Sequence, residues 1–384
     1  MSCSTPNRKI ASNLLLREGE LIPNPVVEVD GSGRIVSIES RPTASMDSSV
    51  CTEFYSGIIM AGFVNAHCHI ELSYLRGAIE SGGGFQRFAS SIGAVRNNFS
   101  DEEREVAMRR ADAELFREGV VAVGDIANGL SSFEIKRESK ILYHTFAELF
   151  GLRSVDLEAV APLLDYPNTS PTPHSLYSLN DKAFRRVVEQ SGDAPLSIHF
   201  MESPSEAELF RGEGPLLQWY QKVGFECDFL HYGSPAERLV SLVPSDRSVM
   251  LIHNCCLTQR DIDTVMGHFS APVTWVICPR SNRYISSLTP PVELLRKNGL
   301  QVAIGTDSLA SNWSLSILEE LRELSGVPLV ERLDWATRWG AAALGISELG
   351  DIEVGRRPAI NILSGINYER MELTPSSKIK QIIY

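Results

Sequence analysis

The chain has 384 residues, of which 43% are hydrophobic and 22% are charged, and its formal net charge is −12 with a pI of about 5.3. This composition is typical of a soluble globular protein with a large core and more than one domain. The negative charge argues against nucleic acid as a partner and favours a small-molecule substrate. The sequence contains no apolar run long enough for a bilayer and no signal-peptide core behind its first residues, so we expect no membrane partner and a cytoplasmic location.

The cysteines are odd in number and scattered, which does not predict a disulfide framework. No Cys-x-x-Cys pair occurs, so a structural zinc site of that type is not expected. The adjacent pair Cys255 and Cys256 is interpreted as two small buried residues on a strand, with a redox role as the alternative. The seven are Cys3, Cys51, Cys68, Cys227, Cys255, Cys256 and Cys278.

The N-terminal part, residues 9–53, is expected to form short strands and turns. Residues 26–29 and 34–38 flank Asp30-Gly31-Ser32-Gly33, a pattern that predicts a β-hairpin.

From residue 58 onward, apolar strand patterns alternate with helical ones. Ser100, for example, is predicted to cap a helix that runs to about Arg117. Strands that are apolar along their whole length are buried on both faces, as in a parallel sheet. The eight predicted strands lie in residues 58–69, 120–125, 141–149, 172–175, 195–200, 249–254, 273–278 and 300–307. Eight such units predict an α/β fold of the (β/α)8 TIM-barrel type, with residues 212–242 as a longer insertion.

A β pattern returns near the C-terminus, in residues 350–355, 359–363 and 379–384. We expect these strands to join the N-terminal ones in a small discontinuous β-sandwich domain. The predicted boundaries are residues 1–56 and 345–384 for this domain and 57–344 for the barrel.

Polar residues gather at the carboxyl ends of the predicted strands, where barrels carry their functional groups. His67 and His69 are two residues apart, so their side chains leave the strand on the same face. Burying two imidazoles side by side requires a common partner, which favours a metal ion over a structural role. The complete set of strand-end residues is His67, His69, His174, His199, Glu202, His253 and Asp307.

These motifs resemble the amidohydrolase superfamily, in its branch of metal-dependent deaminases and chlorohydrolases, which includes guanine, S-adenosylhomocysteine/methylthioadenosine and aminofutalosine deaminases. The resemblance covers nearly the whole chain. It rests on residues 62–69, 75–77, 173–177, 199–202, 251–253, 278–282 and 305–312.

The resemblance implies that His67, His69, His199 and Asp307 bind one divalent metal ion, with Zn²⁺ expected and Fe²⁺ as the alternative. Such an ion lowers the pKa of water toward about 7 and provides hydroxide at neutral pH. Binuclear members carry a bridging lysine on the fourth strand, and this sequence has no matching lysine near His174.

The resemblance also implies the catalytic roles. Asp307 accepts the proton of the water molecule, His253 stabilises the hydroxide, and Glu202 protonates a ring nitrogen and then the leaving amine. For Glu202, a solvated carboxylate at a helix start is the alternative. The predicted reaction is hydrolytic deamination of an aminated heteroaromatic ring in a purine base or nucleoside-like compound, with release of ammonia.

Substrate contacts are predicted for His174, Arg76 and Arg280. A core histidine and structural ion pairs are the respective alternatives. Glu71 departs from the pattern of several nucleoside deaminases, which makes it a candidate for shaping a different pocket. Gly82-Gly83-Gly84, before Phe85, is a candidate mobile lid.

Two other readings keep the same residues. A chlorohydrolase or cyclic-amide hydrolase would use the same site on another leaving group, and a non-catalytic relative would only bind the metal. A homodimer is expected from the branch.

Overall fold

The structure is a computed structural model that describes residues 7–40, 52–152, 158, 160–346 and 348–383. Its strands are β1 (Arg8–Arg17), β2 (Glu20–Pro23), β3 (Pro25–Val29), β4 (Ile35–Ser40), β5 (Thr52–Ala61), β6 (Phe63–Cys68), β7 (Val120–Ala127), β8 (Leu142–Leu149), β9 (Thr169–Pro173), β10 (Leu196–Phe200), β11 (Val249–His253), β12 (Val273–Ile277), β13 (Val302–Ile304), β14 (Ile360–Ser364) and β15 (Lys378–Ile383).

The α-helices are α1 (Phe85–Val95), α2 (Asp101–Arg117), α3 (Phe133–Glu138), α4 (Ala161–Leu164), α5 (Asp181–Gln190), α6 (Pro204–Phe210), α7 (Gly214–Val223), α8 (Pro235–Leu242), α9 (Gln259–His268), α10 (Pro279–Ser286), α11 (Val292–Lys297), α12 (Ile317–Arg322), α13 (Leu329–Trp335) and α14 (Arg338–Ala343). Short 3-10 helices are η1 (Ile70–Leu75), η2 (Arg96–Asn98) and η3 (Leu230–Tyr232). No helix in the described ranges combines the length and the apolar character needed to cross a bilayer.

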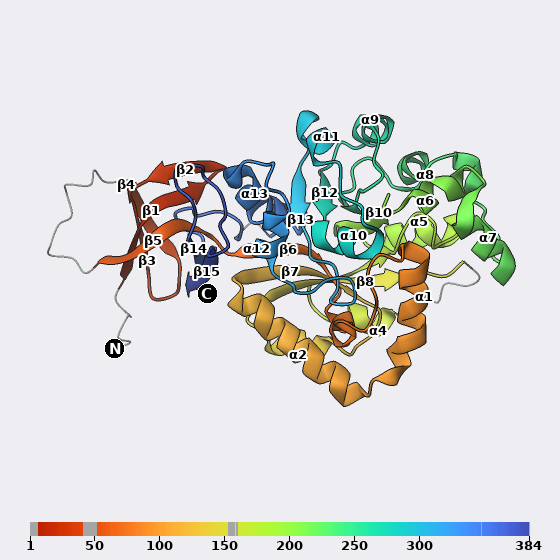
Figure 1. Cartoon of the computed structure of the whole chain (residues 1–384), viewed down its shortest axis with the longest axis horizontal. Coiled ribbons are helices and arrows are strands. Elements are labelled where there is room, and N and C mark those ends of the chain that lie inside the picture. The colour runs from red at the N-terminus through yellow and green to blue at the C-terminus, as the bar shows by residue number, and fades with distance from the viewer. Residues whose placement is uncertain (1–6, 41–51, 153–157, 159, 347, 384) are drawn as a thin grey trace.

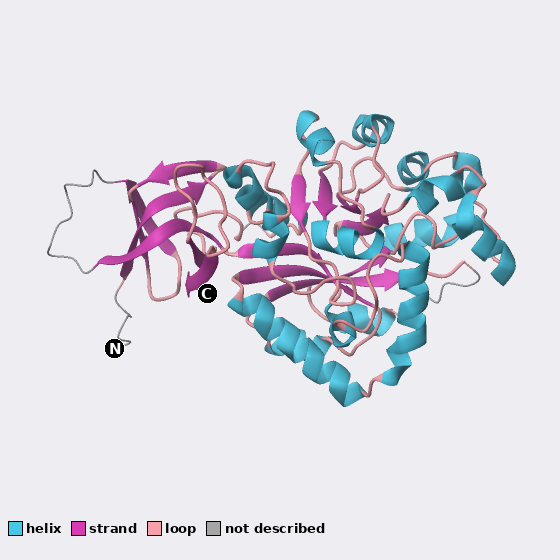
Figure 2. Ribbon diagram, in the orientation of Figure 1, coloured by secondary structure: helices cyan, strands magenta, loops and turns pink. Residues whose placement is uncertain are grey.

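The eight predicted strands form two four-stranded parallel sheets, β6-β7-β8-β9 and β10-β11-β12-β13. Nearly every residue on them is buried, as their apolar sequences predict. The two sheets approach each other at both edges. A single bridge joins Cys68 to Asp307 at one edge, and another joins Ser175 to His199 at the other. Helices lie along the outside of these sheets (Figure 2).

Strands from both ends of the chain build a separate seven-stranded sheet, in the order β15-β14-β5-β1-β3-β4 with β2 beside β1. Figure 1 shows it on the left, apart from the parallel sheets. The predicted hairpin is confirmed, since β3 and β4 pair in antiparallel register around residues 30–33. The described strands here form one sheet, so the second layer of a sandwich stays a prediction.

Two predictions about strand boundaries were wrong. Residues 350–355 form no strand, because the Asp351 carboxylate accepts hydrogen bonds from the backbone N–H of Glu18 and of Ile352 and so holds a turn. The apolar run 58–69 is two strands rather than one. It divides at Gly62, where an added Cβ would lie 2.3 Å from a methyl group of Val121.

The predicted insertion, residues 212–242, folds as α7, η3 and α8, which all contact α6, and α8 also contacts α5. Its anchor is Arg238, a fully buried side chain that donates hydrogen bonds to Asp181 and to the carbonyl groups of Leu176 and Leu179.

Candidate active site

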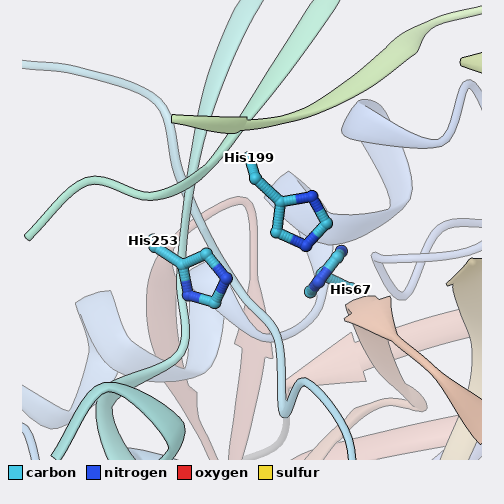
Figure 3. A group of neighbouring side chains, drawn as sticks. All are labelled: His67, His199 and His253. Atoms are coloured by element: carbon cyan, nitrogen blue, oxygen red, sulfur yellow. The ribbon is translucent and has the colours of Figure 1, made fainter. Parts of the chain in front are cut away.

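The strand ends bring four of the predicted ligands together from three separate stretches of sequence. The Nε2 atoms of His67 and His69 lie 3.1 Å apart, and Oδ1 of Asp307 lies 3.5 Å from Nε2 of His69. The His199 ring centre lies 4.9 Å from that of His67. Figure 3 shows the rings of His67, His199 and His253 turned toward one another.

The histidines are held in the state that a metal ligand requires. Burial, reinforced by the neighbouring imidazoles, lowers the pKa of His67 and of His199 well below the usual value, so both are neutral. Nδ1 of His199 lies 2.9 Å from the carbonyl oxygen of His174 and donates its hydrogen there. This hydrogen bond leaves the Nε2 lone pair of His199 free for a metal ion.

Asp307 is positioned by both of its carboxylate oxygens. Oδ2 accepts hydrogen bonds from the hydroxyl groups of Ser281 at 2.5 Å and Ser311 at 2.6 Å, while Oδ1 faces the histidines. Burial would raise the pKa of Asp307, but the charges of His69 and His253 and the two hydroxyl groups outweigh it, and the pKa is lowered. The Asp307 carboxylate is therefore ionised.

His253 and Glu202 lie beside the four predicted ligands. Nε2 of His253 is 3.9 Å from Oε1 of Glu202, and Nδ1 of His253 is 2.9 Å from the side-chain nitrogen of Asn282. Burial raises the pKa of Glu202 well above its usual value, and the carboxylates of Asp307 and Glu206 add to the rise. The raised pKa favours the protonated form of Glu202, which can donate a proton.

Among the described residues, three groups of ligand atoms lie close enough to share a metal ion. They are His67 with His69 and Asp307, His67 with His199 and His253, and Glu148 with His174 and His199. The first two share His67, so together they bring four further side chains close to this residue. The site can therefore hold a divalent ion next to a proton donor and an ionised carboxylate.

The predicted substrate contacts have different surroundings. The His174 ring stacks on that of His199 with centres 4.6 Å apart, so it belongs to the cluster. The Arg76 guanidinium is largely exposed and pairs with Glu114 at 2.6 Å, and that of Arg280 faces Glu319 at 3.6 Å. Their part in substrate binding stays a prediction.

Several residues of the site were not predicted from the sequence. Glu148 ends a predicted strand and carried the same signal as the histidines, namely a polar residue at a strand end. Asp307 accepts hydrogen bonds from Ser281 and Ser311, and His253 contacts Asn282. These three residues lie in the segments quoted for the resemblance, but the contacts of Ser281 and Asn282 join positions far apart in the sequence and were not predicted. The five described cysteines, Cys68, Cys227, Cys255, Cys256 and Cys278, are all free thiols.

Comparison with known proteins supports the resemblance. An adenosine deaminase from Helicobacter pylori is 28% identical over 332 residues, which is 80% of this chain and 79% of that protein. A 5-methylthioadenosine/S-adenosylhomocysteine deaminase from Halobacterium salinarum is 26% identical, covering 96% of this chain and 85% of the relative. The crystal structure of Helicobacter pylori aminofutalosine deaminase in complex with methylthio-coformycin matches with a TM-score of 0.80 at 26% identity, over 94% of this chain and 93% of that one.

The family comparison extends over most of the chain. The model of the amidohydrolase family matches residues 58–383, from the end of β5 to the end of β15. The matched range includes every residue of the candidate active site. The chain belongs to the amidohydrolase family.

Proposed function

We propose that this protein is a metal-dependent hydrolytic deaminase of an aminated heteroaromatic ring, in a purine base or an adenosine-like nucleoside. The observation that carries the proposal is Glu202, a buried carboxyl group with a raised pKa beside His253 and the converging ligands. Protonation of a ring nitrogen is the step that such a group serves, and loss of ammonia requires it. The deaminases among the relatives described above support the same reaction.

We further propose that the two parallel sheets are the halves of one (β/α)8 barrel, spanning residues 57–344. The bridges at both edges of the sheets support this arrangement. Residues 1–56 and 345–384 would then form the discontinuous β domain, whose described strands share one sheet.

The residues present fit one divalent ion, with Zn²⁺ expected. His67, His69, His199 and Asp307 would hold it, because they offer three imidazoles and one ionised carboxylate at a buried point. When bound, the ion supplies Lewis-acid activation of water at neutral pH.

The side chains of the protein would carry the protons. Asp307, kept ionised by its serine partners, accepts a proton from the attacking water molecule. Glu202 donates its proton to the ring nitrogen of the substrate, and the amine then leaves as ammonia after a further proton transfer through the same carboxyl group. His253 donates a hydrogen bond that stabilises the developing negative charge.

The test is ammonia release from adenosine-like, guanine and aminofutalosine-like compounds by the metal-loaded protein. The variant Glu202→Gln should abolish turnover and still bind the metal, because it removes the transferable proton without touching a ligand. Arg109→Gln, in an exposed ion pair with Glu105 on α2, serves as a folded control that should retain both metal and turnover. Release of chloride or opening of a cyclic amide instead of deamination would refute the proposal, and so would loss of metal from Glu202→Gln.

A further inference from the structure

Glu148 presents a buried carboxyl group to the histidine cluster and has no role in the steps above. It lies near the carboxyl end of β8 and is 6% exposed. Its Oε1 atom accepts no hydrogen bond from the described residues and lies 3.7 Å from Nδ1 of His199. A buried carboxylate oxygen without a donor is costly, so it calls for a compensating charge nearby.

The other oxygen of Glu148 is fixed by a chain of hydrogen bonds. The side-chain nitrogen of Asn128 donates to Oε2 of Glu148 at 3.0 Å. The backbone N–H of Asn128 donates to Glu71 at 2.9 Å, and the Ser132 hydroxyl donates to the same carboxylate at 3.3 Å. Glu71 stands in η1, two residues after His69, so the chain connects the ends of three neighbouring strands.

We propose that Glu148, held in place by Asn128 and Glu71, is a positioning residue that orients His199 and strengthens its hold on the metal ion. The inference rests on the proposed role of His199 as a ligand. A metal ion held by His199 would withdraw electron density from the ring and make the Nδ1 hydrogen more positive. The carboxylate beside Nδ1 stabilises that charge, and the bound dication in turn compensates the buried charge of Glu148.

The geometry favours this role over direct contact with the substrate. Oε1 of Glu148 is closed to solvent, so a substrate could reach it only after the surrounding side chains move. His199, in contrast, already lies beside this oxygen, with its Nδ1 atom 3.7 Å away. Glu71 also gains a role, because it faces Asn128 and the serine hydroxyls of the loop after β7 and thus supports the chain of hydrogen bonds.

The test compares the affinity of the metal-stripped full chain for Zn²⁺, measured by competition with a chelator of known affinity. Glu148→Gln keeps the shape and can still accept from Asn128, but it removes the charge. We expect its affinity to fall by about 10- to 100-fold. The matched control is Asp112→Asn. Asp112 accepts hydrogen bonds from Ser139 and from Tyr143 near the other end of β8. The affinity of the Asp112→Asn protein for Zn²⁺ should therefore equal that of the wild type.

A second variant tests the supporting chain. Asn128→Ala should weaken Zn²⁺ binding. The double variant Asn128→Ala/Glu148→Gln should bind Zn²⁺ as tightly as the single variant with the lower affinity, because both changes act through one carboxylate. Thermal unfolding of each metal-free variant shows whether it is folded.

The possible failures are distinguishable. Equal affinity of Glu148→Gln and wild type overturns this inference alone, as does a variant that binds Zn²⁺ normally but has a raised KM, since that marks a substrate contact. A wild-type chain that binds no divalent ion overturns the proposed metal site itself.

Discussion

Gly305 offers a direct test of how tightly the ligand geometry is set. It follows β13 and precedes Asp307 by two residues. A Cβ added there would lie 2.8 Å from Cβ of His67, 3.0 Å from the carbonyl oxygen of His67 and 3.0 Å from Sγ of Cys278. Ordinary contacts of a Cβ are 3.4–4 Å, so the variant Gly305→Ala must push His67 away by about 0.6 Å.

The displacement acts where two ligands are tied together. The carbonyl oxygen of His67 accepts hydrogen bonds from the N–H groups of Thr306 and Asp307, both at 3.0 Å. Moving His67 therefore shifts it relative to Asp307 or stretches these bonds. Overpacking of this kind costs about 1–3 kcal/mol. For each 1.4 kcal/mol of this cost that destabilises the metal-bound state relative to the metal-free state, Zn²⁺ affinity falls about tenfold.

The assay measures Zn²⁺ affinity and the free energy of unfolding of the metal-free protein for Gly305→Ala. We expect both to fall, and kcat/KM for deamination to fall with them. Gly93→Ala is the control, because Gly93 lies on α1 with nothing within 4 Å of its added methyl group and alanine favours the helix. Unchanged Zn²⁺ affinity in a folded Gly305→Ala protein would refute the claim that Gly305 keeps space for His67.

Three further predictions concern the metal and the buried charges. Stripping the metal with a chelator should abolish ammonia release, and one equivalent of Zn²⁺ per chain should restore it; a requirement for two would contradict the single site. Burial raises the pKa of Glu206 from its ordinary value of 4.5 to about 8, so the folded state favours the protonated acid. The free energy of unfolding should therefore fall as the pH rises through this range. Denaturant unfolding of Glu206→Gln should show a flatter pH dependence, and a slope equal to that of the wild type would contradict the argument. Lys136 pairs with the fully buried Asp125 at 2.6 Å, so Lys136→Met should lower the free energy of unfolding by about 3–5 kcal/mol; a loss below about 1 kcal/mol would show that another group compensates the charge.

The parallel strands and the site could be predicted because both depend on local pattern. Strands apolar along their whole length indicated burial on two faces, and the same-face pair His67 and His69 indicated a shared partner. The same reasoning extended to Glu148 would have identified it, since it too ends an apolar strand. The support that Glu148 receives from Asn128 and Glu71 could not be predicted. These contacts depend on loop conformations, which carry no periodic signal in the sequence.

The errors in the fold arose where a side chain competes with the backbone pattern. Residues 350–355 alternate as a strand would, yet the Asp351 carboxylate captures two backbone N–H groups and forms a turn. The division of the apolar run 58–69 at Gly62 depends on the approach of Val121, a residue far along the chain. Long-range packing of this kind is absent from a local pattern.

The three carboxyl groups around the cluster show how the surroundings assign different roles to similar side chains. Asp307 receives two hydroxyl donors and faces imidazoles, so its pKa is lowered and it is suited to bind a metal ion or accept a proton. Glu202 finds no hydrogen-bond donor among the described residues and faces other carboxylates, so it retains a proton that it can give. Glu148 has one donor, Asn128, and turns its other oxygen to the edge of His199, which suits it to support a ligand rather than to transfer a proton. The proposed roles of acid, base and support therefore follow from the donors that each carboxyl group meets, and exchanging those donors should exchange the roles.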